Sequence, residues 1–332
     1  MDYFLKIYTE ICKKEGAISC LKTVTKSGVL ELIRHPAAAM VINTGVSELH
    51  REGAESGKPY IYGGTGNSPV FIERTADVRQ AVQDIIASRT FDHGVVAAAE
   101  QYVVADGLIA EEVRAEMIRN GAYFMNEEEE KKLVNFLCPE KGKADMEVMG
   151  KSAVHLAHQA GFDIPDSARV LVSQQKYISD QNPFATEFLC PVLAYYIESD
   201  WLHACEKCMD LLVKSHGHTL VIHSGDEEVI RQFALKKPVG RVLVNTPATL
   251  GSMGATTNLF PAMTLGSITA GAGITADNVS PMNFIYLRKA GYGVRGAGEF
   301  LRTPGEAPGR EDDQDVKDLL KQILETLSRG LD

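Results

Sequence analysis

Short apolar runs alternate along this chain with segments in which apolar residues recur every three or four positions. The runs are typical of buried strands, and the second spacing is typical of helices that cover a sheet. This alternation predicts a parallel α/β sheet with ligand-binding loops at the carboxyl ends of its strands. The predicted helices are 1–16, one capped by Ser27, one between Thr44 and Gly57, and 75–88, 108–119, 126–136, 149–160 and 201–214; the predicted strands are 20–24, 38–42, 60–62, 102–105, 168–172, 191–197, 219–222, 241–245 and 284–288.

The end of the chain has a different character. Residues 303–313 are rich in proline, glycine and acidic residues, which predicts a flexible linker. A single apolar stripe at helical spacing follows, and Asp315 is placed to cap that helix. A short helix of this kind cannot bury its apolar face alone, and its mixed-charge opposite face is unlike that of a membrane-surface helix. We therefore expect residues 315–332 to dock, either on a partner or back onto this protein or a neighbouring subunit. The stripe consists of Val316, Leu319, Leu320, Ile323, Leu324, Leu327 and Leu331.

Composition and charge exclude several kinds of partner. The chain has 332 residues, of which 45% are hydrophobic and 23% charged, enough for two domains with a sizeable core. Its formal net charge of -10 argues against nucleic acid or an anionic membrane as the main partner. No apolar run is long enough to span a bilayer, and the first residues lack the zones of a signal peptide. We therefore expect a cytoplasmic protein.

One pair among the six cysteines has the spacing of a metal or redox site, Cys205-Glu-Lys-Cys208. No second pair of cysteines or histidines at ligand spacing accompanies it. The pair also lies in a helical pattern, where residues three apart share one face. We therefore expect two packed thiols here and no metal site.

The strongest chemical signal is the stretch from Arg89 to Gln101. It joins a helical pattern to a strand-like run through a glycine-containing turn of small residues. The stretch resembles the nucleophile loop of acylating aldehyde dehydrogenases, in which Phe-Asp-Asn-Gly precedes two apolar residues, a cysteine, a small residue, Ser, Glu and Gln. The residue that matches this cysteine is Ala97. Alanine cannot act as a nucleophile, base or proton donor, so the resemblance implies a family member without its reactive atom. Taken alone, the stretch is better explained as a small-residue turn packed under a neighbouring element.

Other motifs follow the acylating branch of that family in order. Hydrolytic members carry a Glu at the position that Gly63 occupies here, and this Glu acts as the base that activates water. The resemblance therefore implies that the acyl-enzyme is not hydrolysed and that its acyl group is left for coenzyme A. It also implies nucleotide contacts at Thr44, Gly45 and Gly64, a ribose contact for Glu187, and a place for His218 near the substrate and coenzyme A. The motifs are His35-Pro36, Thr44-Gly45, Ser56-Gly57-Lys58-Pro59, Gly64-x-Gly-Asn-Ser-Pro69, Pro-x-x-x-Glu-x-x-x-Pro-Val-Leu at 183–193, and Gly217-His218-Thr219.

The resemblance covers roughly residues 17–295 and implies an aldehyde dehydrogenase-like α/β fold. This fold would combine a partial Rossmann-type nucleotide domain with an α/β catalytic domain, followed by the amphipathic helix on its linker. Complete members have a large portion before the segment that matches residue 1, so we expect either a truncated chain or one completed by a partner. The expected parts are a nucleotide-binding remnant at 1–74, the catalytic domain at 75–258, a closing segment with an oligomerisation strand at 259–295, the linker at 296–314 and the helix at 315–332.

Two functions remain open. In the first, the chain is a coenzyme A-acylating aldehyde dehydrogenase, which would convert aldehyde, NAD and coenzyme A to acyl-CoA and NADH, but is inactive because Ala97 replaces the cysteine and the N-terminal NAD-binding half is missing. Cys190, near Glu187, has a different backbone position and is not expected to substitute. We expect NAD to bind with a Kd above ~1 mM. In the second, the chain is a non-catalytic scaffold or binding subunit of a bacterial microcompartment, because residues 315–332 resemble the peptides that recruit enzymes to such shells. Expected partners are shell or cargo proteins, further copies of this chain or a full-length paralogue. If the helix binds the shell, the expected location is the lumen of the compartment.

Overall fold

The structure is a computed structural model in which the chain divides into two units, residues 1–284 and residues 285–332. It describes residues 6, 10, 18–64, 66–138, 146–178, 183–185, 187–215, 218–267, 273–285, 287–299 and 317–324. The predicted helix at 1–16 lies almost entirely outside the described residues, as does the predicted linker at 303–313. Across the described ranges, no helix combines the length and the apolarity needed to cross a membrane.

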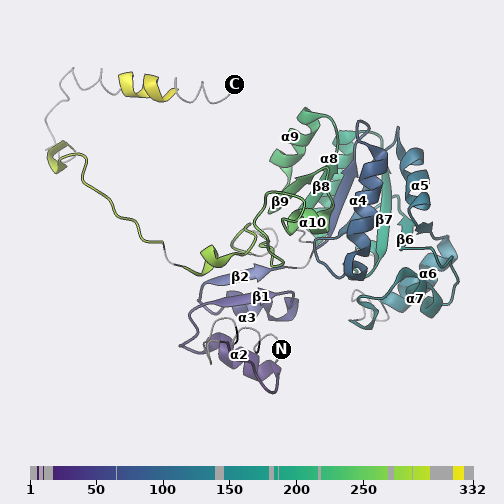
Figure 1. Cartoon of the computed structure of the whole chain (residues 1–332), viewed down its shortest axis with the longest axis horizontal. Coiled ribbons are helices and arrows are strands. Elements are labelled where there is room, and N and C mark those ends of the chain that lie inside the picture. The colour runs from purple at the N-terminus through teal and green to yellow at the C-terminus, as the bar shows by residue number, and fades with distance from the viewer. Residues whose placement is uncertain are drawn as a thin grey trace. The chain divides into compact units, whose positions relative to one another are not determined.

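The first part of unit 1 is a small parallel sheet of two strands (Figure 1). β1 (Val41–Thr44) pairs with β2 (Tyr60–Gly63), and Thr44 lies opposite Gly63 at the carboxyl end of the pair. The helices of this part are α2 (Lys26–Arg34), the 3-10 helix η1 (Ser47–Leu49) and α3 (His50–Ala54). Aromatic packing holds α3 against β2, since the His50 ring lies 4.4 Å from the Tyr62 ring.

Two local predictions in this part are wrong. Residues 20–24 are exposed and form a bend at 22–23 rather than a strand, because none of the strands in the described part of the chain pairs with them. Ser27 does not cap α2; the cap is Thr25, whose Oγ1 accepts a hydrogen bond from the Gly28 N–H at 3.1 Å. Ser27 therefore lies inside the first turn. At the other end of α2, the Lys58 Nζ donates to the Ile33 carbonyl at 2.7 Å and so satisfies a terminal acceptor.

A seven-stranded parallel sheet forms the centre of the rest of unit 1, with the order β5-β6-β7-β4-β3-β8-β9. Every residue of β3 and β4, next to each other in the middle, is buried, as expected for a parallel sheet covered on both faces. β3 lies within the segment 1–74 that was expected to belong to the nucleotide part, but it pairs in this larger sheet. The strands are β3 (Ser68–Ile72), β4 (Glu100–Asp106), β5 (Ala122–Phe124), β6 (Val170–Gln174), β7 (Val192–Glu198), β8 (Thr219–His223) and β9 (Arg241–Val244).

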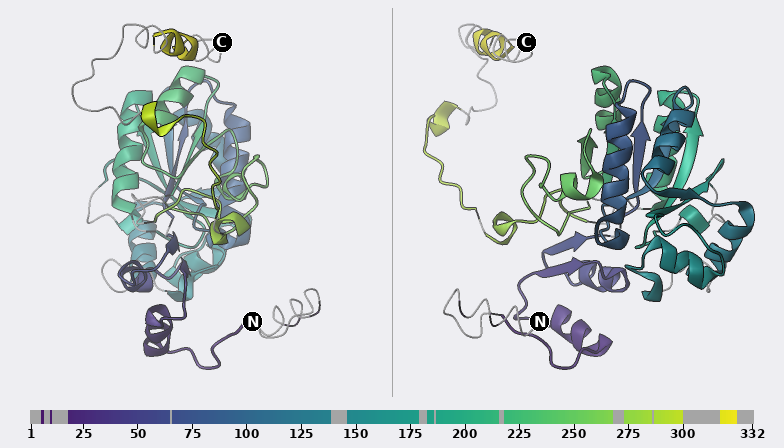
Figure 2. Two further views of the ribbon diagram at one scale, coloured as in Figure 1. Left: turned by 90° about the vertical axis from the view of Figure 1, so that its left-hand side faces the viewer. Right: turned by 45° about the vertical axis from the view of Figure 1, so that its right-hand side comes forward.

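Helices cover both faces of the larger sheet (Figure 2). One face packs against α4 (Val78–Thr90), α5 (Ala110–Arg119) and α10 (Ala248–Ser252). The opposite face packs against α6 (Glu127–Leu137), α7 (Ala153–Ala160), α8 (Trp201–Ser215) and α9 (Glu227–Lys236). Side chains of each central strand alternate between these two core clusters, as the period of two along a strand requires.

Some elements differ from the pattern-based prediction. β3, β5, α9 and α10 were not predicted, because each is short or begins within a segment with turn-forming residues. The predicted strand 284–288 is not formed by its described residues within this chain, and the pairing across subunits that the resemblance implies stays a prediction: the 3-10 helix η6 (Pro281–Phe284) ends at Phe284, and 285 and 287–288 are not in a strand. A strand needs a hydrogen-bonding partner, and none of the described segments of this chain supplies one there.

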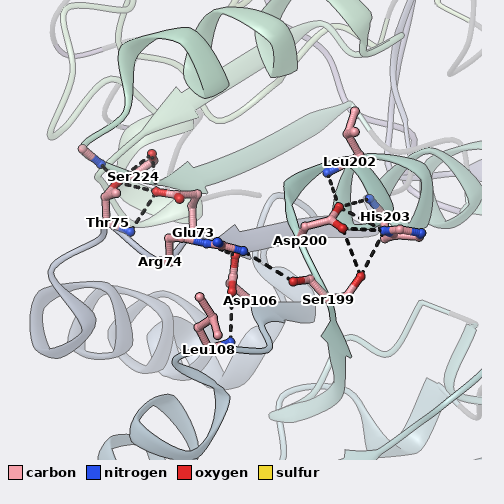
Figure 3. A network of polar contacts seen from close by, with 11 residues as sticks. Glu73, Arg74, Thr75, Asp106, Leu108, Ser199, Asp200, Leu202, His203 and Ser224 are labelled. Carbon is pink, nitrogen blue, oxygen red and sulfur yellow. Dashed lines mark hydrogen bonds and ion pairs between the residues drawn. The ribbon is translucent and has the colours of Figure 1, made fainter.

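The carboxyl edge of the larger sheet is closed by a network of polar contacts (Figure 3). The Glu73 Oε2 accepts hydrogen bonds from the Thr75 N–H and the Ser224 hydroxyl, both at 2.9 Å. Arg74 Nε lies 2.9 Å from Asp106 Oδ2, and the Asp106 carboxylate is fully buried. These contacts fix the loops that follow the central strands, so this edge is stabilised by side chains that the sequence pattern did not identify.

Unit 2 contains the predicted amphipathic stripe, of which the structure describes residues 317–324. Residues 317–324 are helical, which agrees with the prediction for this part of 315–332. Leu319, Leu320, Ile323 and Leu324 are each about half exposed or more. The apolar face is therefore present on a helix, and its docking remains a prediction.

Candidate functional site

A cavity of about 330 Å³ lies between the two sheets. It is bounded by the carboxyl ends of β1 and β2 and by the segments that precede β4, β7 and β8. The sequence predicted ligand-binding loops at the carboxyl ends of the strands. In the small sheet the cavity does lie at the carboxyl ends. In the larger sheet the prediction is wrong, because the amino edge of that sheet faces the cavity. The reason is that the chain passes directly from the end of β2 into the start of β3. The six residues selected from the sequence all line this cavity: Thr44, Gly45, Gly64, Ala97, Glu187 and His218.

The turn that carries Ala97 has an unusual backbone. Asp92, His93 and Gly94 have φ values of 47°, 50° and 79°, so three successive residues are left-handed between α4 and β4. Such conformations are costly for residues with a side chain and persist only where the surroundings impose them. A hydrogen bond of 2.9 Å from the Ala99 N–H to the Val96 carbonyl closes the turn. Ala97 is thereby held at the cavity wall.

Gly66 makes the closest backbone approach to this turn. A Cβ atom on residue 66 would lie 1.4 Å from the Ala97 carbonyl oxygen, so no side chain is possible there without movement. The Gly66 N–H also donates a 2.8 Å hydrogen bond to Glu187 Oε1. The segments before β3, β4 and β7 therefore meet at one point beside the cavity.

A buried arginine supports the segment that carries Glu187. Arg89, in α4, is fully buried, and its guanidinium donates to the carbonyls of Phe188, at 2.6 Å, and Cys190. Gln101 Nε2 donates to the same Phe188 carbonyl at 2.6 Å. Burial lowers the pKa of Arg89 to about 10, so it remains a cation at neutral pH. Arg89 and Gln101 flank Ala97 in the sequence motif, but only the structure showed that both side chains hold the segment around Phe188.

Two carboxyl groups near the cavity titrate close to neutral pH. Burial raises the pKa of Glu187 to about 7, against the opposing effects of the Gly66 hydrogen bond and the Arg89 charge. Burial likewise raises the pKa of Glu100, the first residue of β4, to about 7. Glu100 Oε1 accepts from the Ala248 N–H at 2.8 Å, whereas its Oε2 has no hydrogen-bond partner within the described part of the chain. Glu100 was not selected from the sequence, although it belongs to the motif around Ala97.

His218 is a neutral hydrogen-bonding group in this structure. Burial, and then the charge of Arg241, lower the pKa of His218 to about 3. Its Nδ1 lies 2.7 Å from Thr219 Oγ1 and 3.3 Å from Arg241 Nη1. Arginine offers only donors, so Nδ1 accepts and the ring proton resides on Nε2. His218 can therefore donate a hydrogen bond but is a poor base.

No cysteine within the described ranges lines the cavity. Cys190 lies next to the turn through its backbone, since a Cβ on Gly94 would approach the Cys190 carbonyl carbon to 2.9 Å. Its thiol, however, packs in the core cluster on the α8 face, and burial raises the pKa of Cys190 to about 12. A thiol in that state is not a nucleophile at neutral pH, which agrees with the expectation that Cys190 does not replace the missing group.

Comparisons with known proteins are consistent with this arrangement. The sequence pattern of a family described as "Aldehyde dehydrogenase family" matches residues 2–152. The structure is similar to a probable aldehyde dehydrogenase from Listeria monocytogenes EGD-e, with 41% identity and a TM-score of 0.86, covering 90% of this chain and 67% of that one. It is also similar to an acetylating aldehyde dehydrogenase from Geobacillus thermoglucosidasius, with 36% identity, a TM-score of 0.84, and coverage of 88% and 66%.

A curated relative is longer. The aldehyde-alcohol dehydrogenase of Streptococcus pneumoniae is 32% identical over 286 residues, which are 82% of this chain and 32% of that protein. The chain thus spans about a third of the length of the aldehyde-alcohol dehydrogenase it matches.

Proposed function

This chain belongs to the aldehyde dehydrogenase family, and on that premise we propose that it keeps the ligand cavity of a coenzyme A-acylating member without oxidising aldehydes itself. Its relatives include acylating enzymes such as the succinate-semialdehyde dehydrogenase (acetylating) of Clostridium kluyveri, 29% identical over 279 residues. In such chemistry a cysteine thiolate forms a covalent bond to the aldehyde carbon. NAD, when bound, would accept the hydride, and coenzyme A would take the acyl group.

The observation that carries this proposal is the methyl group of Ala97 at the cavity wall. A methyl group has no lone pair to attack a carbonyl carbon and no proton to transfer. The polar side chains that line the cavity include Thr44, Asp92, Glu187 and the neutral His218 ring. None of these groups supplies a thiolate. The chain therefore lacks the first step of the family's reaction.

The cavity wall fits the reactive end of an acyl thioester. Apolar side chains of Val95, Val96, Met149, Leu189 and Leu265 form much of it, which suits a slender acyl and pantetheine chain. Its volume of about 330 Å³ is near the lower limit for small-molecule sites. In support, a propionaldehyde dehydrogenase from Rhodopseudomonas palustris, 25% identical with a TM-score of 0.69, has been solved with bound CoA and an acylated cysteine.

For a nicotinamide nucleotide, the fitting groups are fewer. Thr44 offers a hydroxyl, and Glu187 offers a carboxyl oxygen in addition to the one that binds Gly66. Gly45 and Gly64 line the wall without side chains, so a ligand can approach their main chain closely. These residues would hold the nucleotide, and we propose that the binding is weak, with a Kd above ~1 mM.

The test restores only the missing thiol and needs no NAD. Ala97→Cys is incubated with propionyl-CoA, and the intact protein mass is measured. The introduced thiolate should attack the thioester carbonyl, the bond from that carbon to the coenzyme A sulfur should break, and coenzyme A should leave as a thiolate that takes up a proton. The expected result is a propionyl adduct on the variant and none on the unsubstituted chain.

A matched control places the thiol two residues further along, in Ala99→Cys, because the Ala99 side chain is buried and does not line the cavity. It should not be acylated. A folded Ala97→Cys variant that acquires no acyl group would contradict the retained cavity. NADH formation by the unsubstituted chain from propionaldehyde and coenzyme A, free of contaminating enzyme, would contradict its inactivity.

A second function rests on the helix at 317–324, whose leucines are exposed. We propose that residues 315–332 attach the chain to the shell or cargo of a bacterial microcompartment, directly or with further copies or a full-length paralogue. In support, a propionaldehyde dehydrogenase from the Clostridium phytofermentans fucose utilisation bacterial microcompartment is 26% identical, with a TM-score of 0.74. The location would then be the compartment lumen in the cytoplasm.

A further inference from the structure

Away from the cavity, a lysine and a cysteine are buried against each other. Cys205 belongs to α8 and Lys237 is the C-cap of α9, two helices that pack on the same face of the larger sheet (Figure 1). Their exposed fractions are 8% and 7%. The Lys237 Nζ lies 2.6 Å from the Cys205 Sγ and donates to the Cys205 carbonyl at 2.9 Å. Neither residue lines the cavity, so this pair is independent of the proposed function.

The surroundings of this lysine are unusual for a buried cation. Buried lysines are normally paired with a carboxylate, because an isolated charge in the interior is costly. Within the described part of the chain, no carboxylate forms an ion pair with Lys237. Its contacts are a carbonyl, a sulfur and the Phe233 ring, whose centroid is 4.7 Å away. Charge pairing therefore does not explain why this amine is buried here.

The separation of the two atoms points to chemistry. A distance of 2.6 Å is too short for an ordinary hydrogen bond from nitrogen to the large sulfur atom, and too long for a direct bond. It is the separation expected of a nitrogen and a sulfur that are both bonded to one oxygen atom. We propose that Cys205 and Lys237 form an oxidative cross-link in which a single oxygen bridges Sγ and Nζ, with a peroxide as oxidant.

The atoms and electrons balance with two molecules of hydrogen peroxide. The Cys205 sulfur attacks the first, the O–O bond breaks, and the products are a sulfenic acid and water. The Lys237 ammonium group loses its extra proton to solvent. Formation of the O–N bond then removes one hydrogen from the sulfenic acid and one from the amine. The second peroxide accepts both hydrogens with their electrons and becomes two water molecules.

Cys208 provides the competing reaction. It lies three residues after Cys205 in α8 and is also buried in the same core cluster. A sulfenic acid on Cys205 that condensed with Cys208 would give a disulfide within the helix instead of a link between helices. Only the link to Lys237 joins α8 to the end of α9, and it would restrict the unfolded chain between residues 205 and 237.

The test treats the full chain with hydrogen peroxide and maps the products by mass spectrometry. The expected product gains one oxygen and loses two hydrogens, and the change lies on a cross-linked pair of peptides that contain Cys205 and Lys237. A thiol reductant should reverse it. The cross-linked form should melt roughly 5–10 °C higher, because the unfolded state is constrained.

Three variants sharpen the result. Cys208→Ser should keep the cross-link, whereas Cys205→Ser and Lys237→Met should lose it. The peptide map of the unsubstituted chain decides the question even if a variant does not fold. A Cys205–Cys208 disulfide, or a sulfinic acid on Cys205, would overturn the proposal. So would an unmodified Lys237 under conditions that oxidise the exposed Cys20, which serves as the internal control.

Discussion

Adding one methyl group at Gly66 should destabilise the protein and disturb the cavity together. The glycine lies where the chain passes from the small sheet to the larger one, and its Cα faces the Ala97 carbonyl group. In Gly66→Ala, the new Cβ would lie 1.4 Å from the Ala97 oxygen and 2.2 Å from its carbon. Both obstacles are main-chain atoms, so no side-chain rotation can relieve the overlap.

The magnitude follows from the contacts that must change. To reach ordinary contact at 3.4 Å, the two main-chain segments must separate by about 2 Å. Overpacking of this kind costs ~1–3 kcal/mol. The movement also breaks the 2.8 Å hydrogen bond from the Gly66 N–H to Glu187, which leaves a buried carboxyl group short of a donor and costs a further ~1–3 kcal/mol. Together we expect a loss of roughly 2–6 kcal/mol of unfolding free energy.

Urea unfolding followed by tryptophan fluorescence measures this loss. The chain has a single tryptophan, Trp201, which packs against the core cluster on the α8 face. The matched control is Gly161→Ala, where a Cβ would meet no atom within 4 Å but φ is +86°. The control should lose only the ~1–2 kcal/mol of left-handed strain. The reasoning is refuted if Gly66→Ala is no less stable than Gly161→Ala.

Three further outcomes are expected. Burial raises the pKa of Glu100 from 4.5 to about 7, so its contribution to stability is fully present below pH 4.5 and is lost as pH rises through 7. Glu100→Gln should remove ~3 kcal/mol of this pH dependence. If the unfolding free energy from urea unfolding changed with pH equally in both proteins between about pH 5 and about pH 8, the prediction would be contradicted. Glu73→Ala removes the acceptor of hydrogen bonds from Thr75 and Ser224, of which the one from Ser224 is buried, and should cost ~2 kcal/mol by the same assay, whereas a loss under ~0.5 kcal/mol would show that the network is dispensable. Residues 315–332 fused to a fluorescent protein should reach microcompartment shells, and Leu320→Glu with Leu324→Glu should abolish this by placing charges in the apolar contact; a fusion that stays diffuse while shells form decides against docking.

Sequence patterns alone indicated the fold class and selected six of the residues that line the cavity. Alternating strand and helix patterns predicted a parallel α/β architecture, and the similarity to solved aldehyde dehydrogenases supports it. The family motifs also selected Thr44, Glu187 and His218, which lie far apart in the chain but line one cavity. The motifs encode backbone turns, which are local, whereas the roles of these residues remain predictions.

Only the tertiary structure decided which strands are neighbours and how the cavity is supported. Hydrophobic periodicity records which face of an element is buried, but it does not record the partner on that face. The sequence therefore could not show that the amino edge of the larger sheet faces the cavity, or that Arg89 holds the segment before β7. It also could not show that the Cys190 thiol points into the core while its backbone borders the Ala97 turn. These features depend on contacts between residues about a hundred positions apart, and such contacts exist only once the sheet has assembled.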